Sequence, residues 1–230
     1  MSQTYKNYEV IVIYDDACLK EVAFVKSVLK KVILKKLIIN NKNYGVGISR
    51  NKGIMQASGT LIAFCDADDT WKKDKLNTQI NFMIKNNLMI SHTSYFVINE
   101  KSKVIGKFNI KNKLSYNDLL KSCDIGLSTV IAKKRLLQDN KFNKLKTKED
   151  YLLWLKIAKK IKHIYGIDQN LSSWRKNENS LSSSVIQKFI DTYRLYRLYL
   201  NNNFILSVLF SFRLVFYAIR KKFLIFWSNN

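Results

Sequence analysis

Three short apolar runs alternate with helical patterns over the first 85 residues, and this alternation constrains the fold more than any other feature. The strand-like runs cover residues 8–14 (YEVIVIY), 32–39 and 60–65 (TLIAFC). Apolar side chains recur at helical spacing over residues 19–29, 45–57 and 71–85. Strands that alternate with helices predict a parallel α/β sheet flanked by helices. Ligands of such sheets bind beyond the carboxyl ends of the strands, where two of these runs end in aspartates.

The pattern changes after residue 90. Residues 90–110 alternate apolar and polar side chains, which indicates antiparallel strands, and 164–174 reads as extended. Helices are expected over 116–122, over 148–160 and through most of the chain beyond 184. The polar stretch near 180–185 is the expected boundary between a domain of residues 1–180 and a helical tail of residues 181–230.

The charge is strongly positive, with 40 Lys and Arg against 17 Asp and Glu, a formal net charge of +23. Such a charge favours nucleic acid, an anionic membrane surface or phosphate-bearing substrates. The absence of proline and the abundance of Lys, Asn and Ile are typical of an AT-rich genome, which accounts for part of the charge. No nucleic-acid module is recognisable, so nucleic-acid binding is the least favoured of the three.

The three cysteines and the first residues bear on location. Three widely spaced cysteines without a CxxC pair argue against a disulfide framework or zinc site and for a reducing cytosol. The opening MSQTYKNYEV lacks the pattern of a signal peptide. We therefore expect a cytoplasmic protein.

The tail from Phe204 to Trp227 is strongly apolar and aromatic. A membrane-spanning helix needs about 20 mainly apolar residues. Here Arg213 interrupts the run, and the basic stretch 220–222 interrupts it again. An amphipathic helix lying in the membrane interface fits this pattern better than a span, and an ordinary helix packed on the domain is the alternative.

The acidic cluster 66–69 follows the third strand-like run and contributes Asp66, Asp68 and Asp69. Three carboxylates so close together repel one another, and a bound Mg²⁺ or Mn²⁺ relieves that repulsion. With substrate phosphates completing its coordination, such a metal would assist departure of a phosphate-bearing leaving group. The cluster taken alone is also compatible with a solvated turn and a helix N-cap.

Two further segments carry candidate chemistry. Gly45 and Gly47 lie at the start of a predicted helix, where they let backbone N–H groups approach an anion. Arg50 adds a guanidinium that can bind phosphate with two hydrogen bonds. The spacing is not that of a dinucleotide-binding fingerprint. Glu149 and Asp150 open another helix, where acids are also ordinary matches for the helix dipole. Asp150 is the candidate general base, with Glu149 beside it.

In their order along the chain, these motifs resemble family 2 glycosyltransferases over roughly residues 2–180. The motifs are the run 5–9, the pair Asp15–Asp16, the segment Gly45–Gly53 around Arg50, the cluster from Phe64 to Trp71, and the segment Glu149–Leu155. The resemblance implies the GT-A fold, a Rossmann-like mixed sheet flanked by helices. It is nearest to enzymes that build lipopolysaccharide or capsular polysaccharide.

The resemblance also implies a role for each matching residue. Asp16 would contact the nucleobase, typically uracil, and Asp15 beside it would belong to the nucleotide-sugar site. Arg50 would lie near the donor, and Asp66 and Asp68 would match the DxD metal motif, with Asp69 beside them. Asp150 would be the base of an inverting single displacement. Trp174 and Arg175 resemble a segment near the donor and acceptor. The implied cofactor is Mn²⁺ or Mg²⁺, with a nucleotide sugar, usually a UDP-sugar, as donor.

This chain departs from the family pattern at its start. Family members begin with a strand ending in a Pro-x-Tyr-Asn pattern, then a helix ending just before Gln-Thr-Tyr, whereas here Gln3-Thr4-Tyr5 follows directly on two residues. We expect the first strand and most of the first helix to be missing, which leaves sheet edges unpaired. After Asp16, the family's usual Gly-Ser-Thr-Asp is replaced by Ala-Cys-Leu-Lys.

The sequence thus predicts an inverting glycosyltransferase of surface-glycan synthesis, peripheral at the inner face of the cytoplasmic membrane. Its partners would be a nucleotide sugar, a lipid-linked saccharide or polysaccharide acceptor, and an anionic membrane surface. The alternative is a non-catalytic truncated remnant that binds nucleotide or membrane weakly. A basic nucleic-acid-binding protein is disfavoured, and the oligomeric state stays open.

Overall fold

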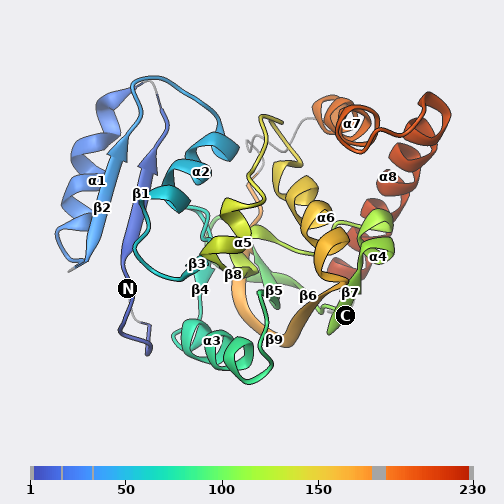
Figure 1. Ribbon diagram of the computed structural model, residues 1–230. Helices are drawn as coiled ribbons and strands as arrows, with labels where there is room; N and C mark the ends of the chain where they lie inside the picture. Colours follow the sequence, from blue (N-terminus) through green and yellow to red (C-terminus); the bar gives the residue numbers. More distant parts are fainter. Residues whose placement is uncertain (1–2, 17, 33, 178–184, 228–230) are drawn as a thin grey trace.

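A computed structural model of the chain describes residues 3–16, 18–32, 34–177 and 185–227, and Figure 1 shows a mixed α/β arrangement. A small sheet pairs β1 (Val10–Tyr14) with β2 (Lys35–Ile39) in parallel, with Val12 opposite Leu37. The β-branched run of β1 favours the extended state. Between the two strands the chain forms a short 3₁₀ turn, η1 (Leu19–Glu21), and α1 (Val22–Leu29).

The second sheet has seven strands in the order β3-β8-β5-β9-β4, with β6 paired to β5 and β7 paired to β9. Its long central pair, β5 and β9, is parallel, and the other pairs are antiparallel. The strands are β3 (Leu61–Ala63), β4 (Thr70–Trp71), β5 (Ile90–Ile98), β6 (Val104–Phe108), β7 (Lys113–Ser115), β8 (Ile131–Lys133) and β9 (His163–Arg175).

Helices cover both sheets (Figure 1). In the body of the protein they are α2 (Val46–Gln56), α3 (Lys75–Lys85), α4 (Tyr116–Lys121), the 3₁₀ turn η2 (Leu127–Thr129), α5 (Lys134–Gln138) and α6 (Glu149–Ile161). The C-terminal part contains α7 (Val185–Arg194), the π-helical turn η3 (Leu195–Tyr199) and α8 (Phe204–Trp227).

The main hydrophobic core is built around α6. Tyr151, Trp154 and Leu155 are fully buried, as expected of a helix that is apolar on most of its surface. The Tyr151 hydroxyl donates to Leu119 O at 2.7 Å and lies 3.1 Å from the Tyr196 hydroxyl. The C-terminal helices therefore share their core with the body of the protein.

Helix α8 carries its apolar side chains outward. Ser207, Ser211 and Leu214 are buried against the body, whereas Phe212 and Phe216 are about two-thirds exposed, at 62% and 63%. Two of the charged side chains in this run bond inward, Arg213 to Leu120 O and Lys221 to Cys123 O. Within the described residues, no helix combines the length and the apolarity that a membrane crossing requires.

The mixed α/β fold with a helical C-terminal part is confirmed, but β3 is not where the alternation placed it. We expected β3 to continue a parallel sheet with β1 and β2, and it pairs instead with β8 in antiparallel orientation. Among the described residues, β1 pairs with β2 and β3 pairs with β8, so β1 and β3 belong to separate sheets. The expected boundary at 180–185 lies largely outside the described residues.

Candidate active site

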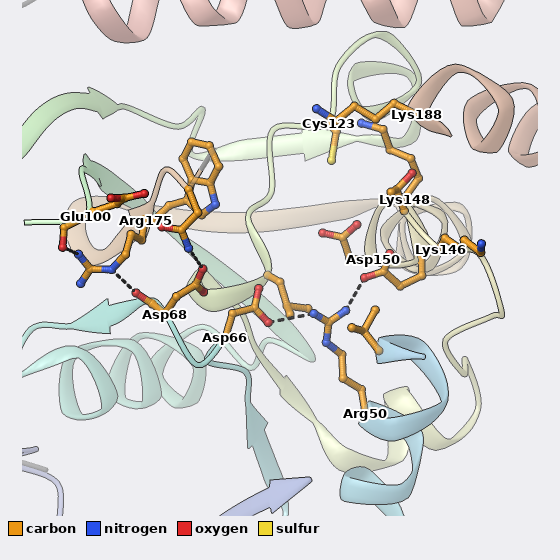
Figure 2. A pocket seen from close by; sticks show the side chains of 16 residues that line it. Arg50, Asp66, Asp68, Glu100, Cys123, Lys146, Lys148, Asp150, Arg175 and Lys188 are labelled. Carbon is orange, nitrogen blue, oxygen red and sulfur yellow. Dashed lines mark hydrogen bonds and ion pairs between the residues drawn. The ribbon is translucent and has the colours of Figure 1, made fainter. Parts of the chain in front are cut away.

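A cavity of about 650 Å³ opens where α2, the loop after β3, the end of β9 and the starts of α6 and α7 meet (Figure 2). Its volume falls within the range of small-molecule sites. It collects most of the residues that the sequence singled out, namely Arg50, Asp66, Asp68, Glu149, Asp150, Trp174 and Arg175.

Arg50 lines this cavity between two acidic side chains. Its Nη2 donates to Asp66 Oδ1 at 2.9 Å and its Nη1 donates to Glu149 Oε1. Burial lowers the pKa of Arg50, and the Asp66 and Glu149 carboxylates more than compensate, so that the pKa lies above its usual range. A single guanidinium thus joins the acidic loop to the start of α6.

Close packing explains why α2 reaches this position. A Cβ at Gly47 would lie 2.3 Å from Asn143 O, so only glycine allows helix and loop to approach so closely. Asn51 exchanges hydrogen bonds with both backbone groups of Phe142, at 2.9 and 3.0 Å. Gly47 therefore serves helix–loop packing, a role that the sequence did not suggest.

Glu149 and Asp150 occupy the first turn of α6, and both titrate above their usual range. Burial and the neighbouring Asp150 raise the pKa of Glu149 to about 7, against the lowering effect of Arg50. Burial raises the pKa of Asp150, while Arg50 and Lys148 oppose the shift. Asp150 Oδ1 accepts from Tyr151 N at 2.6 Å, which fixes the carboxylate at the helix N-terminus. A carboxyl with a raised pKa in a cavity is suited to accept a proton.

The three clustered aspartates do not act as a unit. Asp66 and Asp68 line the cavity, whereas Asp69 does not, and its Oδ1 accepts from Arg175 N at 2.9 Å. Burial raises the pKa of Asp69 to about 6, with the Asp66 and Asp68 charges adding to the shift. Across the part of the chain that the structure describes, no three His, Cys, Asp or Glu side chains are arranged to hold a metal. The assignment of Asp66, Asp68 and Asp69 together as metal ligands therefore stays a prediction.

Asp66 and Asp68 nevertheless fit a metal that arrives with its substrate. One oxygen of each carboxylate is engaged, by Arg50 at 2.9 Å and by Asn177 Nδ2 at 2.7 Å, which leaves a second oxygen on each. Mg²⁺ is commonly held by one or two carboxylates together with substrate phosphates and waters. Two aspartates in an open cavity match that donor set.

Trp174 and Arg175 close the cavity at the end of β9. Trp174 is 43% exposed, so its ring is open to a ligand. The Arg175 guanidinium donates to Asp68 O at 2.8 Å and to Asn99 O at 2.7 Å, which ties the acidic loop to the β5–β6 connection. Arg175 is thus a positioning residue for the loop that carries Asp68.

Asp15 and Asp16 lie apart from this cavity, at the end of β1 in the smaller sheet. Asp15 Oδ1 accepts from Asn40 Nδ2 at 2.6 Å and from Tyr44 N at 2.9 Å, and Asp16 Oδ1 accepts from Cys18 N at 2.9 Å. Neither lines the cavity, so the expected nucleobase contact stays a prediction.

Some residues that line the cavity were not singled out from the sequence, above all Lys146 and Lys188. The chain has 40 Lys and Arg residues, and nothing in the sequence distinguishes these two lysines from the others. Only the fold, which packs α7 beside the start of α6, brings them to the same cavity as Asp150.

Comparison with known proteins decides the family. A family model described as glycosyl transferase family 2 matches residues 1–146. The chain belongs to this family. This family 2 member is 38% identical over 190 residues to the Escherichia coli UDP-Glc:alpha-D-GlcNAc-diphosphoundecaprenol beta-1,3-glucosyltransferase WfgD, covering 80% of this chain and 72% of WfgD. Two further curated relatives, from Rickettsia, are spanned over only 29% of their length.

Solved structures show the same fold. S. aureus TarS in complex with UDP-GlcNAc superposes with a TM-score of 0.69 at 20% identity, over 86% of this chain and 58% of that one. The mannosyltransferase PcManGT from Pyrobaculum calidifontis, in complex with GDP-Man and Mn²⁺, gives a TM-score of 0.65 at 13% identity, over 88% of this chain and 58% of that one. The family 2 glycosyltransferase described here thus has the GT-A fold.

Proposed function

We propose that this family 2 glycosyltransferase moves a sugar from a UDP-sugar, with inversion, to a lipid-linked saccharide or polysaccharide in surface-glycan synthesis. The observation that carries the proposal is the Arg50 bridge, which joins Asp66 of the acidic loop to Glu149 beside Asp150 in one cavity. The name of WfgD, a UDP-Glc-dependent enzyme that acts on a diphosphoundecaprenol-linked sugar, supports the donor and acceptor classes.

The cavity contains the groups that a single displacement requires. Asp150 accepts the proton of the attacking hydroxyl as the new bond to the anomeric carbon forms and the bond to the donor diphosphate breaks. The Arg50 guanidinium, between Asp66 and Glu149, holds the acidic loop and the base at a fixed separation. Trp174 offers an open ring against which a sugar face packs.

Asp66 and Asp68 would hold the divalent metal, Mn²⁺ or Mg²⁺. When bound, the metal would neutralise charge on the departing nucleoside diphosphate. The Mn²⁺ in the PcManGT complex supports this assignment, because that enzyme shares the fold.

Membrane attachment through α8 is the second part of the proposal. A row of exposed apolar side chains runs along the outer face of this helix: Phe204, Ile205, Leu209, Phe212, Phe216, Ile219 and Phe223. An exposed apolar face of this extent marks an interaction surface. The net charge of +23 favours a membrane of anionic lipid over one of neutral lipid. We place the protein at the cytoplasmic face of the membrane, in keeping with its three free cysteines.

One observation favours a second candidate, a non-catalytic remnant of such an enzyme. Among the described residues, β1 and β3 each lack a partner on one side, and Asp15 and Asp16 lie outside the cavity. A donor nucleotide would then have fewer contacts than in an uninterrupted sheet. Such a remnant binds nucleotide weakly and transfers nothing.

The two candidates are separated by transfer and binding measured on the same preparation. The 230-residue chain is incubated with Mn²⁺, a panel of UDP-sugars and an N-acetylglucosaminyl diphosphate lipid, and product is detected by mass spectrometry. A glycosylated lipid supports the transferase. Failure of every donor, together with no rise in melting temperature on adding UDP and Mn²⁺, supports the remnant.

A further inference from the structure

We infer that Lys146, Lys148 and Lys188 form an acceptor-diphosphate subsite, which selects acceptors whose sugar is attached to lipid through a diphosphate. The inference rests on the proposed function and assigns the acceptor side of the same cavity. All three lysines line the cavity together with Asp150.

The three lysines lie on the opposite side of the cavity from the acidic loop. Lys146 and Lys148 precede α6 and Lys188 comes from α7, whereas Asp66 and Asp68 follow β3. Figure 2 shows Asp150 between the two groups. A base in this position meets the donor from one side and the acceptor from the other, so the lysines fall on the acceptor side.

Hydrogen bonds fix the lysine-bearing loop to α7. Thr147, between two of the lysines, donates from its N and its Oγ1 to Asp191 Oδ2, at 2.9 and 3.0 Å. The Asp191 side chain is fully buried and lies one helical turn after Lys188. Buried contacts therefore hold the loop that carries Lys146 and Lys148 against α7, the helix that carries Lys188.

The backbone of Lys148 is held in an unfavourable conformation. Its φ of 68° is left-handed, which side chains larger than Asn or Asp seldom adopt. Strain of this kind persists where the surrounding structure requires it and is concentrated at functional sites. Here it places Lys148 directly before the acidic pair that opens α6.

Charge separates the two halves of the cavity. In the half around the acidic loop, Asp66, Asp68 and Glu100 stand against Arg175, which suits a metal-bound donor. In the half around α7, Lys146, Lys148 and Lys188 line the cavity together with Glu149 and Asp150. Ammonium groups gathered on one side of a cavity suit a ligand with two phosphates.

An apolar surface continues from this basic half. Lys188 is flanked on α7 by the exposed side chains of Ile186, Phe189 and Ile190. The Phe189 ring packs edge-on against Phe212 of α8, with ring centroids 5.8 Å apart. A lipid chain along this face would leave its diphosphate at the lysines and its sugar beside Asp150.

The test compares two acceptors that differ only in the diphosphate. One is N-acetylglucosaminyl diphosphate on a short alkyl chain, and the other is the alkyl N-acetylglucosaminide. Lys146→Ala, Lys148→Asn and Lys188→Ala are combined, with Asn chosen because it tolerates the left-handed backbone. Lys144→Ala, exposed in the same loop and outside the cavity, is the matched control.

We expect the wild-type protein to prefer the diphosphate acceptor by about 100-fold in kcat/KM, from roughly tenfold for each of two charge-assisted contacts. The triple variant should lose most of this preference, and the control should keep it. Equal use of both acceptors by the wild-type protein, or an unchanged preference in the triple variant, overturns the inference while the proposed function stands. Transfer to neither acceptor refutes the proposed function instead.

A second measurement uses the wild-type protein alone and does not depend on the folding of a variant. An alkyl diphosphate without sugar should inhibit competitively against the acceptor and not against the UDP-sugar. Competition against the donor alone would place the diphosphate at the acidic loop and overturn the assignment.

Discussion

Arg50 Nη2 lies 2.9 Å from Asp66 Oδ1, and the other end of the same guanidinium bonds Glu149, 99 positions further along the chain. The side chain of Arg50 is 18% exposed, and its contact with Glu149, itself 8% exposed, is made largely away from water, whereas Asp66 is 42% exposed. One cation thus holds together the acidic loop of Asp66 and the helix that begins with Glu149 and Asp150.

Replacing Arg50 tests this bridge. Arg50→Met leaves the Glu149 carboxylate, 8% exposed, without its partner, and removal of one partner of a buried ion pair costs about 3 kcal/mol. We expect a lower melting temperature and weaker UDP binding. In a double-mutant cycle, adding Glu149→Gln should restore part of the lost stability. Additive losses would show that the two side chains are not coupled.

Removing the proposed base should abolish transfer without abolishing donor binding. For Asp150→Asn we expect kcat to fall about a thousandfold, the typical contribution of a positioned general base. The rise in melting temperature with UDP and Mn²⁺ should stay near that of the unmodified protein. Asp139→Asn, on the exposed end of α5, is the control. Transfer that survives in Asp150→Asn would assign the base elsewhere.

The metal assignment predicts different behaviour for neighbouring aspartates. Asp68→Asn should remove most of the stabilisation by Mn²⁺ plus UDP, because Asp68 lines the cavity. Asp69→Asn should lower the melting temperature yet keep that stabilisation, since Asp69 bonds Arg175 N rather than facing the cavity. Thermal melts with Mn²⁺, or with EDTA in its place, measure both effects. Loss of the Mn²⁺ response in Asp69→Asn would restore Asp69 as a ligand.

The outward apolar face of α8 predicts binding to lipid. Combined Phe212→Asp and Phe216→Asp should reduce co-sedimentation with vesicles of anionic lipid without lowering the melting temperature, because both side chains are exposed. Ile84→Asp, 71% exposed on α3, provides a control with the same change in polarity. Equal sedimentation of all three proteins would contradict membrane docking by α8.

Lys75 predicts a pH dependence of stability. It is fully buried, its Nζ donates to Gln79 Oε1 at 2.7 Å, and burial lowers its pKa to about 7. Because the unfolded state keeps a Lys pKa of about 10.4, it binds more protons than the native state above pH 7, so this group stabilises the fold increasingly as pH rises.

Lys75→Met removes that contribution. The melting temperature of the unmodified protein minus that of Lys75→Met should increase between pH 7 and 8.5, because other titrating groups are common to both proteins. A difference that stays constant with pH would show that Lys75 remains charged in the native state.

Local patterns determined a large part of this protein. The β-branched run of β1, the helical spacing of α1 and α3, and the alternation of β5 and β6 identified those elements because each is long enough for its period to show. Arg50, Asp66 and Asp150, which the structure brings to one cavity, could also be singled out from the sequence, since these residues follow a strand end or lie in the first turns of helices.

The tertiary structure alone decided which strands pair and in which direction particular side chains point. β8 is three residues long, too short for any period, yet it takes the place beside β3 that the alternation gave to a parallel neighbour. Asp68 lines the cavity and Asp69 does not, because the carboxylate of Asp69 accepts a hydrogen bond from the backbone N of Arg175, 106 positions away. Hydrogen bonds and packing between distant segments make these choices, and such contacts leave no trace in the spacing of neighbouring residues.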